Sequence, residues 1–404
     1  MVAALAGRDA ERVAALRTGL EAASLDGLIC ALPSNVLLLS GYWPVVGTAV
    51  ALIGPGDTIV VIAPRDEHEL AERGWANEII ALESGGLDAI TTIPDALRAP
   101  LRRAIERAHL RGGRVGIEHD VRCEPFSYVA TYRYEATLQQ LLRDCGLTLV
   151  PADDLLSRLR ARLTIRERDI AASACRIARR AFTSAAPQLR AGLSETEAAT
   201  LFRAPLSALT GEDDIRRADG FTFCMSGPNS ARAFGAYARS TSKRLREGEL
   251  VLVHCNSYAD GLWTDITRTY CLGKPDERGR AMYEAVFAAR SAALAAIAPG
   301  VRAADVDAAA REVMSSRGFG ALFKHSTGHG VGFAAIDAGA QPRLHPASPD
   351  VLLAGMVCNV EPAVYIDGYG GLRHCDIVAV TESGCEVLTP FHATPEDLVI
   401  AESG

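Results

Sequence analysis

The sequence predicts a protein of the α/β or α+β class that is built from two domains. Its 404 residues suffice for two domains of roughly 100–200 residues each. Short apolar runs alternate with helical stretches over residues 1–155, which is typical of a small α/β domain. Residues 156–404 begin with helical periodicity and then change to long strands. We therefore expect a first domain at 1–155 and a second domain at 156–404.

The first domain is expected to open with an amphipathic helix in which Val13, Leu16 and Leu20 share one face. Apolar runs bounded by Gly, Pro and Asp residues then predict short strands, with helices between the later ones. These strands are expected at 27–31, 49–53, 58–62, 114–117 and 148–151, and a further short apolar element is expected at 35–39 after the first strand. The turn Gly54-Pro55-Gly56-Asp57 joins the second of them to the third.

The second domain is expected to start with helices within 155–188 and 195–210, followed by two β-hairpins. The first hairpin spans 249–272, and its turn contains Asp260-Gly261, a strong hairpin signal between apolar runs. The second hairpin spans 356–381 and turns within a segment rich in Asp and Gly.

Composition excludes several classes of function. The net charge of −7 and the sequence pI of 5.8 disfavour a main role in binding nucleic acid or an anionic membrane, because both need a clustered basic surface. No apolar run reaches the length of a membrane span, and the N-terminal segment lacks the pattern of a secretory signal. None of the ten cysteines forms a C-x-x-C pair, and most are expected to be small buried hydrophobes in a reducing cytoplasm. We therefore expect a cytoplasmic protein without nucleic-acid or membrane partners.

Side chains able to bind a divalent metal gather on the two hairpins and on a Gly-rich segment between them. Side chains alternate along a strand, so a hairpin can bring His254 and Asp265 close together. The three segments offer the donor set His254, Asp265, His329, Glu361 and Cys375. Imidazole, carboxylate and thiolate are the side-chain types that bind zinc and related metals. Spacing alone leaves each residue open to a structural role.

Five motifs in the second half carry a resemblance to a known family. They are Ser226-Gly227-Pro228-Asn229-Ser230-Ala231, Asp265-Ile266-Thr267-Arg268-Thr269, Thr327-Gly328-His329-Gly330-Val331-Gly332, Glu361-Pro362 and Gly371-Leu372-Arg373. From about residue 160 onward the chain resembles the pita-bread catalytic domain of the creatinase and Xaa-Pro peptidase family, M24. Residues before about 150 resemble the creatinase-type N-terminal domain, with Ser34-Asn35-Val36 and Leu39-Ser40-Gly41-Tyr42 as markers. The resemblance thus implies a creatinase-type N-terminal α/β domain followed by a pita-bread catalytic domain.

The resemblance implies a metal site with two altered ligands. In the peptidases of this family, Asp, Asp, His, Glu and Glu hold two divalent ions, in that chain order. The second Asp falls on Asp265, the His on His329 and the first Glu on Glu361. The first Asp falls on His254 and the last Glu on Cys375. Two of the five expected ligands are therefore replaced by other side chains that bind metals.

The substrate side of the site also departs from the family pattern. Phe234 stands where the family usually has a catalytic or substrate-binding His, which makes it a candidate substrate-binding residue. His325 matches the substrate-side His of the proline-specific members, and Arg373 matches their substrate-binding or structural Arg. The dipeptide Ile336-Asp337 replaces a frequent His-Glu pair.

One divalent metal, Zn, Mn or Fe, is the expected cofactor. Asp265, His329, Glu361 and Cys375 make a reasonable tetrahedral set for one ion. Two dications would be undercompensated, because two of the family's four carboxylates are replaced. The alternative is that no metal binds, as in creatinase. Creatinase, however, uses a catalytic His at the position of Phe234, so creatinase activity is not expected here.

The expected reaction is hydrolysis of a peptide or amide C–N bond in a small molecule or short peptide. Glu361 is the expected base, and His325 is expected to stabilise the tetrahedral intermediate. In a minor alternative, Cys375 acts as a nucleophile after ionisation by His254 or His374. Two further alternatives are a metal-free creatinase-like hydrolase or lyase, and a catalytically silent binding protein.

The resemblance also implies a homodimer, because family members with the N-terminal domain commonly assemble so that this domain contributes to the neighbour's active site. Tyr42, Trp43 and Arg65 are candidate contributors to substrate binding. The alternative is that Tyr42 and Trp43 simply pack their loop.

Overall fold

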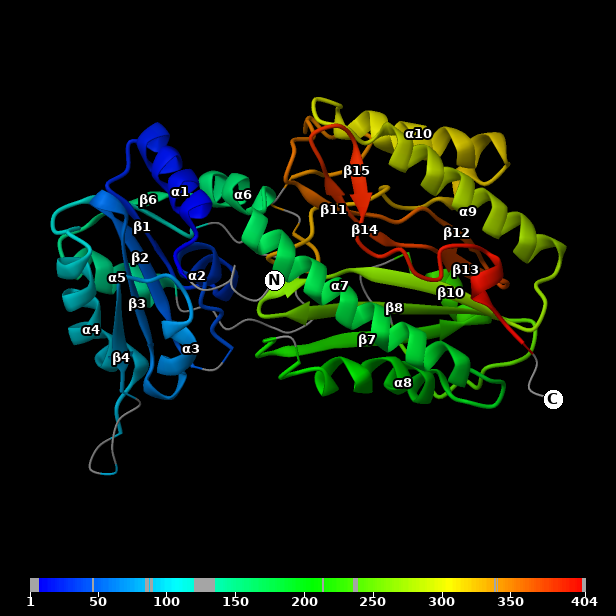
Figure 1. Cartoon of the computed structure of the whole chain (residues 1–404), viewed down its shortest axis with the longest axis horizontal. Helices are drawn as coiled ribbons and strands as arrows, with labels where there is room; N and C mark the ends of the chain where they lie inside the picture. Colours follow the sequence, from blue (N-terminus) through cyan, green and yellow to red (C-terminus); the bar gives the residue numbers. More distant parts are fainter. Residues whose placement is uncertain are drawn as a thin grey trace. The chain divides into compact units, whose positions relative to one another are not determined.

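The computed structural model describes residues 7–45, 47–83, 87, 90–119, 135–212, 214–234, 239–337, 339 and 341–401 (Figure 1). The chain divides into two compact units, Met1–Arg160 and Ala161–Gly404. The predicted domain boundary after residue 155 stays a prediction. The predicted class, a mixture of helices and sheets, is confirmed.

A six-stranded sheet forms the centre of the first unit, with strand order β4-β3-β2-β1-β5-β6. Its strands are β1 Gly27–Cys30, β2 Val50–Gly54, β3 Thr58–Pro64, β4 Glu78–Leu82, β5 Arg114–Ile117 and β6 Thr148–Pro151. The middle strands β1, β2 and β3 pair antiparallel, whereas β4, β5 and β6 join them in parallel. The five predicted strands are confirmed, and those at 114–117 and 148–151 have the predicted bounds.

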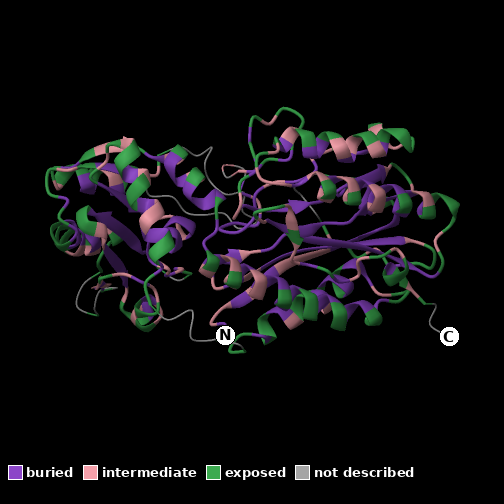
Figure 2. Ribbon diagram, turned by 45° about the horizontal axis from the view of Figure 1, so that its top comes forward, coloured by how far each residue is buried: buried purple, intermediate pink, exposed green. Residues whose placement is uncertain are grey.

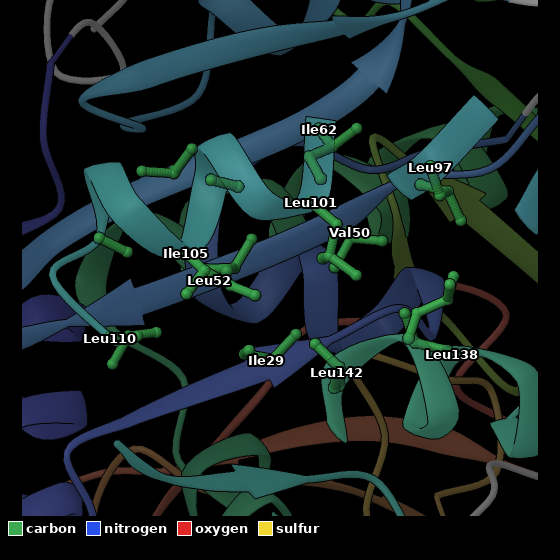
Figure 3. Close-up of a cluster of buried hydrophobic side chains, with 14 of the residues drawn as sticks. Ile29, Val50, Leu52, Ile62, Leu97, Leu101, Ile105, Leu110, Leu138 and Leu142 are labelled. Atoms are coloured by element: carbon green, nitrogen blue, oxygen red, sulfur yellow. The ribbon is translucent and has the colours of Figure 1, made fainter. Parts of the chain in front are cut away.

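Helices cover this sheet and bury its apolar side chains. They are α1 Ala10–Ala23, α2 Pro33–Ser40, α3 His68–Glu72, α4 Ile93–Arg107, α5 Glu135–Asp144 and α6 Asp153–Ala161. Figure 3 shows Leu101 and Ile105 of α4 above Leu52 of β2, in a cluster that also contains Ile29 and Leu142. Removing these aliphatic side chains from water is the main favourable contribution to the stability of this unit.

The first helix behaves as its apolar pattern predicts. Val13, Leu16 and Leu20 of α1 are buried, and the Asp9 carboxylate caps the helix by accepting a hydrogen bond from the Arg12 backbone N–H. Residues 35–39, which follow the first strand, lie within α2.

The second unit contains a five-stranded sheet in which β16, β10, β8 and β7 follow one another and β9 pairs with β8. Its strands are β7 Ala218–Ser226, β8 Leu250–Ala259, β9 Leu262–Trp263, β10 Ile266–Leu272 and β16 Val399–Ile400. Smaller sheets are formed by β11 Val357–Val360, β14 Asp376–Val380 and β15 Cys385–Val387, and by β12 Ala363–Ile366 and β13 Gly370–Arg373. Both predicted hairpins are therefore present, and the second one is interrupted between its outer and inner strand pairs.

Four long helices flank these sheets: α7 Ile165–Ala185, α8 Glu195–Ala208, α9 Glu277–Ala296 and α10 Ala303–Ser316. Helices α7 and α8 lie on the sheet of β7 and β8, and α9 contacts α10 and β11 to β13 (Figure 1). Figure 2 shows the strands almost entirely buried and the outer faces of these helices exposed. Thr164 and Ser194 start α7 and α8 with capping boxes, which fix where these two helices begin.

Two sequence predictions concern the chain as a whole. Among the described residues, no helix is long and apolar enough to cross a membrane. Nine cysteines are free thiols, and most are buried, as predicted. Cys123 lies outside the described residues.

Candidate metal centre

Strand register places the first predicted ligands on one face of the large sheet. His254 of β8 lies opposite Thr267 of β10. The same register continues into the pairing of Tyr258 with Trp263, so Asp265 lies across from Asn256. His254 and Asp265 therefore project to the same side, and their Nδ1 and Oδ1 atoms are 3.5 Å apart. The predicted proximity of these two side chains is confirmed.

The second hairpin brings Glu361 and Cys375 to Asp265. The Cys375 backbone N–H donates to the Thr267 carbonyl at 3.0 Å, which attaches this hairpin to β10. One donor atom from each of Asp265, Glu361 and Cys375 lies within 4.8 Å of the other two. All three side chains are buried, so this is a compact, water-poor group of metal-binding side chains.

His329 joins this group through a backbone contact with β11. The His329 N–H donates to Asn359 Oδ1 at 2.7 Å, and the Asn359 N–H donates to the His329 carbonyl at 3.0 Å. Gly328 permits this close approach, because a Cβ atom at this position would lie 2.0 Å from the Asn359 carbonyl oxygen. The His329 Nε2 atom is 3.5 Å from Asp265 Oδ2 and 3.7 Å from Glu361 Oε1.

The hydrogen bonds of His329 define a tautomer suited to binding a cation. Its Nδ1 donates to the Gly330 carbonyl, so in the neutral ring that a metal ion requires, Nε2 carries the lone pair. Nε2 faces the two carboxylates, and the Asn359 amide nitrogen is 3.0 Å away. Without a cation, burial alone would lower the pKa of His329, but Asp265 and Glu361 outweigh burial and raise that pKa to about 9. The two carboxylates thus favour positive charge at this point.

His254 is held differently from His329. Arg373 Nη2 lies 2.9 Å from His254 Nδ1, and a guanidinium can only donate, so Nδ1 is an acceptor. The ring proton then sits on Nε2 and is donated to Asn256 Oδ1 at 2.9 Å. Burial, which outweighs the Asp265 charge, lowers the pKa of His254 to about 4. His254 is consequently neutral, and its Nδ1 lone pair is already engaged by Arg373.

Arg373 is fixed from several sides at the edge of the donor group. Its Nε donates to Thr267 Oγ1 at 3.0 Å, and its Nη1 donates to the Ala233 carbonyl at 3.2 Å. Its Nε is also 3.9 Å from Glu361 Oε2. The guanidinium therefore supplies a permanent positive charge beside Glu361 and His254.

The two carboxyl groups of the site, Glu361 and Asp265, have pKa values shifted in opposite directions. Burial raises the pKa of Glu361 to about 7, and the nearby charge of Asp265 adds to this effect. Burial would also raise the pKa of Asp265, but His254, His329 and Arg373 outweigh it and lower that pKa to about 2. At neutral pH, Asp265 is thus a carboxylate and Glu361 exchanges a proton readily.

Cys375 is a protonated thiol in this environment. Burial, followed by the charges of Asp265 and Glu361, raises its pKa well above the ordinary value. Its Sγ donates to the Asp265 backbone carbonyl at 2.9 Å. Burial also lowers the pKa of His374 to about 4, and the His374 ring faces Asp376 at 3.4 Å. Neither His254 nor His374 carries the positive charge that would ionise the thiol, so the geometry gives no support to the alternative of a Cys375 nucleophile.

His325 and Phe234 lie together at the side of the site predicted to bind substrate. His325 Nδ1 donates to the Ser326 carbonyl, and its Nε2 accepts from the Tyr365 hydroxyl at 2.9 Å. Burial lowers the pKa of His325 to about 4, so the ring is neutral and offers no free donor to a tetrahedral intermediate. Phe234 is 45% exposed and packs edge-on against Tyr365, with ring centroids 5.8 Å apart.

The remaining candidates lie in the first unit. Tyr42 is buried, and its hydroxyl donates to Glu67 Oε2 at 3.2 Å. Trp43 is half-buried, and Arg65 pairs with Glu83 on the surface. The geometry of Tyr42 favours the alternative of loop packing, and a role of Trp43 or Arg65 in substrate binding stays a prediction.

Sequence reasoning missed three polar side chains that shape this site: Asn256, Asn359 and Tyr365. Each contacts a predicted residue, namely His254, His329 and His325 respectively. The alternation of strand β8 could have indicated Asn256, which is two residues from His254 and therefore on the same face. No comparable signal marks Asn359 or Tyr365.

Comparison with known proteins shows the family. A family model described as metallopeptidase family M24 matches residues 169–382, which is more than half of the chain. This chain belongs to metallopeptidase family M24. A second model, the creatinase/prolidase N-terminal domain, matches residues 12–162 of this M24 protein. The predicted family is thus confirmed, and so is the predicted order of domains, in which a creatinase-type N-terminal domain precedes a catalytic domain.

Several relatives match this M24 protein over nearly its whole length. The Xaa-Pro dipeptidase of Pyrococcus furiosus is 29% identical over 379 residues, which cover 94% of this chain and 97% of the relative. The crystal structure of the prolidase from Pyrococcus horikoshii OT3 has a TM-score of 0.74 at 26% identity, covering 94% of this chain and 98% of that chain. The prolidase from Pyrococcus furiosus has a TM-score of 0.72 at 28% identity, with coverages of 93% and 98%.

Proposed function

We propose that this M24 protein hydrolyses a peptide C–N bond in a short substrate, and that Xaa-Pro dipeptides are the first substrate class to test. The observation that carries the proposal is the convergence of Asp265, Glu361 and Cys375 within 4.8 Å, with the His329 ring beside them. The relatives named Xaa-Pro dipeptidase and prolidase support the choice of substrate.

One divalent ion, Zn, Mn or Fe, is part of this proposal, and Asp265, His329, Glu361 and Cys375 would hold it. The donors are chemically suitable, since carboxylate, imidazole and thiolate are all zinc ligands. Ligand atoms of a tetrahedral zinc site are roughly 3.3–3.8 Å apart, given bonds of about 2.0–2.3 Å. The separations of up to 4.8 Å among the three acidic groups need only a small contraction around an ion.

The arrangement favours one ion over two. A second ion would need the His254 Nδ1 lone pair, which accepts a hydrogen bond from Arg373 at 2.9 Å. Displacing the guanidinium would also leave a buried positive charge beside a second dication. Asp265, Glu361 and an ionised Cys375 offer three negative charges, and Arg373 beside them carries one positive charge. One dication makes this group neutral, whereas two dications leave two net positive charges.

The residues around the ion have separable roles in the proposed reaction. When bound, a divalent ion supplies polarisation of the scissile carbonyl and acidification of water. Glu361 accepts a proton from the attacking water in this reaction. His325 holds the Tyr365 hydroxyl by accepting its proton, and Phe234, which packs against the Tyr365 ring, offers an apolar surface on the substrate side.

Metal analysis combined with a dipeptide assay tests the proposal. Purified protein is loaded with Zn, Mn or Fe, its metal content is measured by plasma mass spectrometry, and hydrolysis of Xaa-Pro and Xaa-Ala dipeptides is compared. We expect hydrolysis that depends on metal and prefers Xaa-Pro. Cys375→Ala should lower both metal content and activity, whereas Cys358→Ala, a buried thiol outside the donor group, should change neither.

The alternatives predict other results. Activity on amide or guanidino substrates that survives chelation would identify a metal-free hydrolase or lyase. Bound metal without turnover of any substrate would favour a binding protein.

The proposal further includes a cytoplasmic location and a homodimer, and light scattering on the purified protein tests the homodimer. The double variant His254→Asp with Cys375→Glu should bind a second ion if these positions replace family ligands.

A further inference from the structure

Asn256 carries a buried amide group that the described residues leave unsatisfied. The side chain is fully buried on β8, and its Oδ1 accepts from His254 Nε2. Its Nδ2 atom has no hydrogen-bond partner among the residues that the structure describes. Orphaned buried donors are rare in native proteins, because the lost hydration of the N–H groups is not recovered.

Neighbouring residues fix the orientation of this amide. Arg373 can only donate, so His254 Nδ1 accepts and His254 Nε2 carries the ring proton. Asn256 must then present its oxygen to Nε2, because rotating the amide by 180° would set two donors against each other. The Arg373–His254–Asn256 chain therefore ends in an N–H₂ group directed away from His254.

Cross-strand pairing shows what surrounds that N–H₂ group. Asn256 lies between Phe221 of β7 and Asp265, all on the same face of the sheet. Asp265 belongs to the buried donor group, whereas Phe221 and the next residue on this face of β8, Tyr258, are half-buried. The free donor thus lies where the buried donor group meets a partly open aromatic surface.

We propose that the Asn256 amide is a substrate-binding group, and that its Nδ2 donates a hydrogen bond to an oxygen atom of the substrate. The acceptor is a peptide carbonyl or a carboxylate oxygen, since a neutral amide donor suits both. The inference rests on the proposed function for the identity of the substrate as a short peptide. It adds to that function by naming the residue of β8 that binds an oxygen atom of the substrate.

Three dipeptide isosteres that cannot be hydrolysed separate binding from turnover. The parent compound is an Ala-Pro ketomethylene isostere, which keeps both the carbonyl and the carboxylate. The second compound has a methylene in place of the carbonyl, and the third has hydrogen in place of the carboxylate. Their affinities for the metal-loaded full chain are measured by titration calorimetry. Loss of affinity with the second or third compound shows that the missing carbonyl or carboxylate contributes to binding, and the Asn256 variants show whether its partner is Asn256.

Two substitutions separate the donor role of Asn256 from its support of His254. Asn256→Asp removes the donor and keeps an acceptor for His254, whereas Asn256→Ala removes both. We expect the parent compound to bind about tenfold more weakly to both variants, and the ratio of its affinity to that of the oxygen-deleted compound to fall by the same factor. Cys255→Ala, a buried change on the opposite face of β8, should leave all three affinities unchanged. Circular dichroism and metal content confirm that each variant is folded and loaded.

Each other outcome has one meaning. A tenfold loss confined to Asn256→Ala would overturn the inference, because the amide would then serve only to orient His254. Retention of the full difference between compounds in both variants would overturn it as well. If the wild-type protein binds none of the three compounds, the proposed peptide substrate fails first, and the inference falls with it.

Discussion

Binding of a divalent ion to the metal-free protein should release about two to three protons per ion at pH 7. The number follows from the buried donor groups. His329, with a pKa of about 9, must lose a whole proton, and so must the Cys375 thiol, whose pKa is raised well above its ordinary value. Glu361, with a pKa of about 7, contributes about half a proton, and Asp265, with a pKa of about 2, contributes none.

Titration calorimetry measures this release. Zinc is added to metal-free protein at pH 7 in buffers that differ in ionisation enthalpy, and the slope of the observed heat against that enthalpy gives the number of protons released. Cys375→Ala should release about one proton fewer per ion. Cys358→Ala should match the wild type, because this thiol lies outside the donor group. Release of less than one proton would refute the assignment of His329 and Cys375 as ligands.

Two further predictions concern packing and pH. Gly328→Ala should destabilise the protein by about 1–3 kcal/mol and weaken metal binding, because its Cβ would lie 2.0 Å from the Asn359 carbonyl oxygen. Urea unfolding measures the loss of stability, and Gly384→Ala, where a Cβ has space, is the control. In the metal-free protein, the raised pKa of His329 contributes stability that is complete below its ordinary value of 6.5 and lost as the pH rises through about 9. Below pH 7 the raised pKa of Glu361 acts in the same direction, but the lowered pKa values of His254, His325 and His374 act in the opposite direction there. The urea midpoint should therefore fall as the pH rises from 7 to 9, and a midpoint that rises over this range would contradict the shift of His329.

The parts of the fold that follow from local patterns could be predicted from the sequence. The Asp260-Gly261 turn sets the register of β8 against β9 and β10, and this register alone brings His254 to Asp265. The backbone approach of the Gly-rich segment to β11 agrees with the glycine at 328. These contacts depend on strand alternation and backbone shape, which short segments of sequence encode.

Contacts between distant side chains could not be predicted in the same way. The engagement of His254 by Arg373 joins residues from two different hairpins, and the hydrogen bond from Tyr365 to His325 depends on rotamers set by packing. Both contacts change a predicted role: His254 becomes a poor candidate for a second ion, and His325 loses its free donor. Side-chain partners of this kind emerge only when the whole catalytic unit is assembled.

The central claim is that the second unit holds a single divalent ion at Asp265, His329, Glu361 and Cys375. The most direct test is the metal-to-protein ratio of the full chain after saturation with zinc and removal of excess ion, measured by plasma mass spectrometry. The structure predicts a ratio near one that falls toward zero in His329→Ala. A ratio near two, or near zero, in the wild-type protein would contradict the claim.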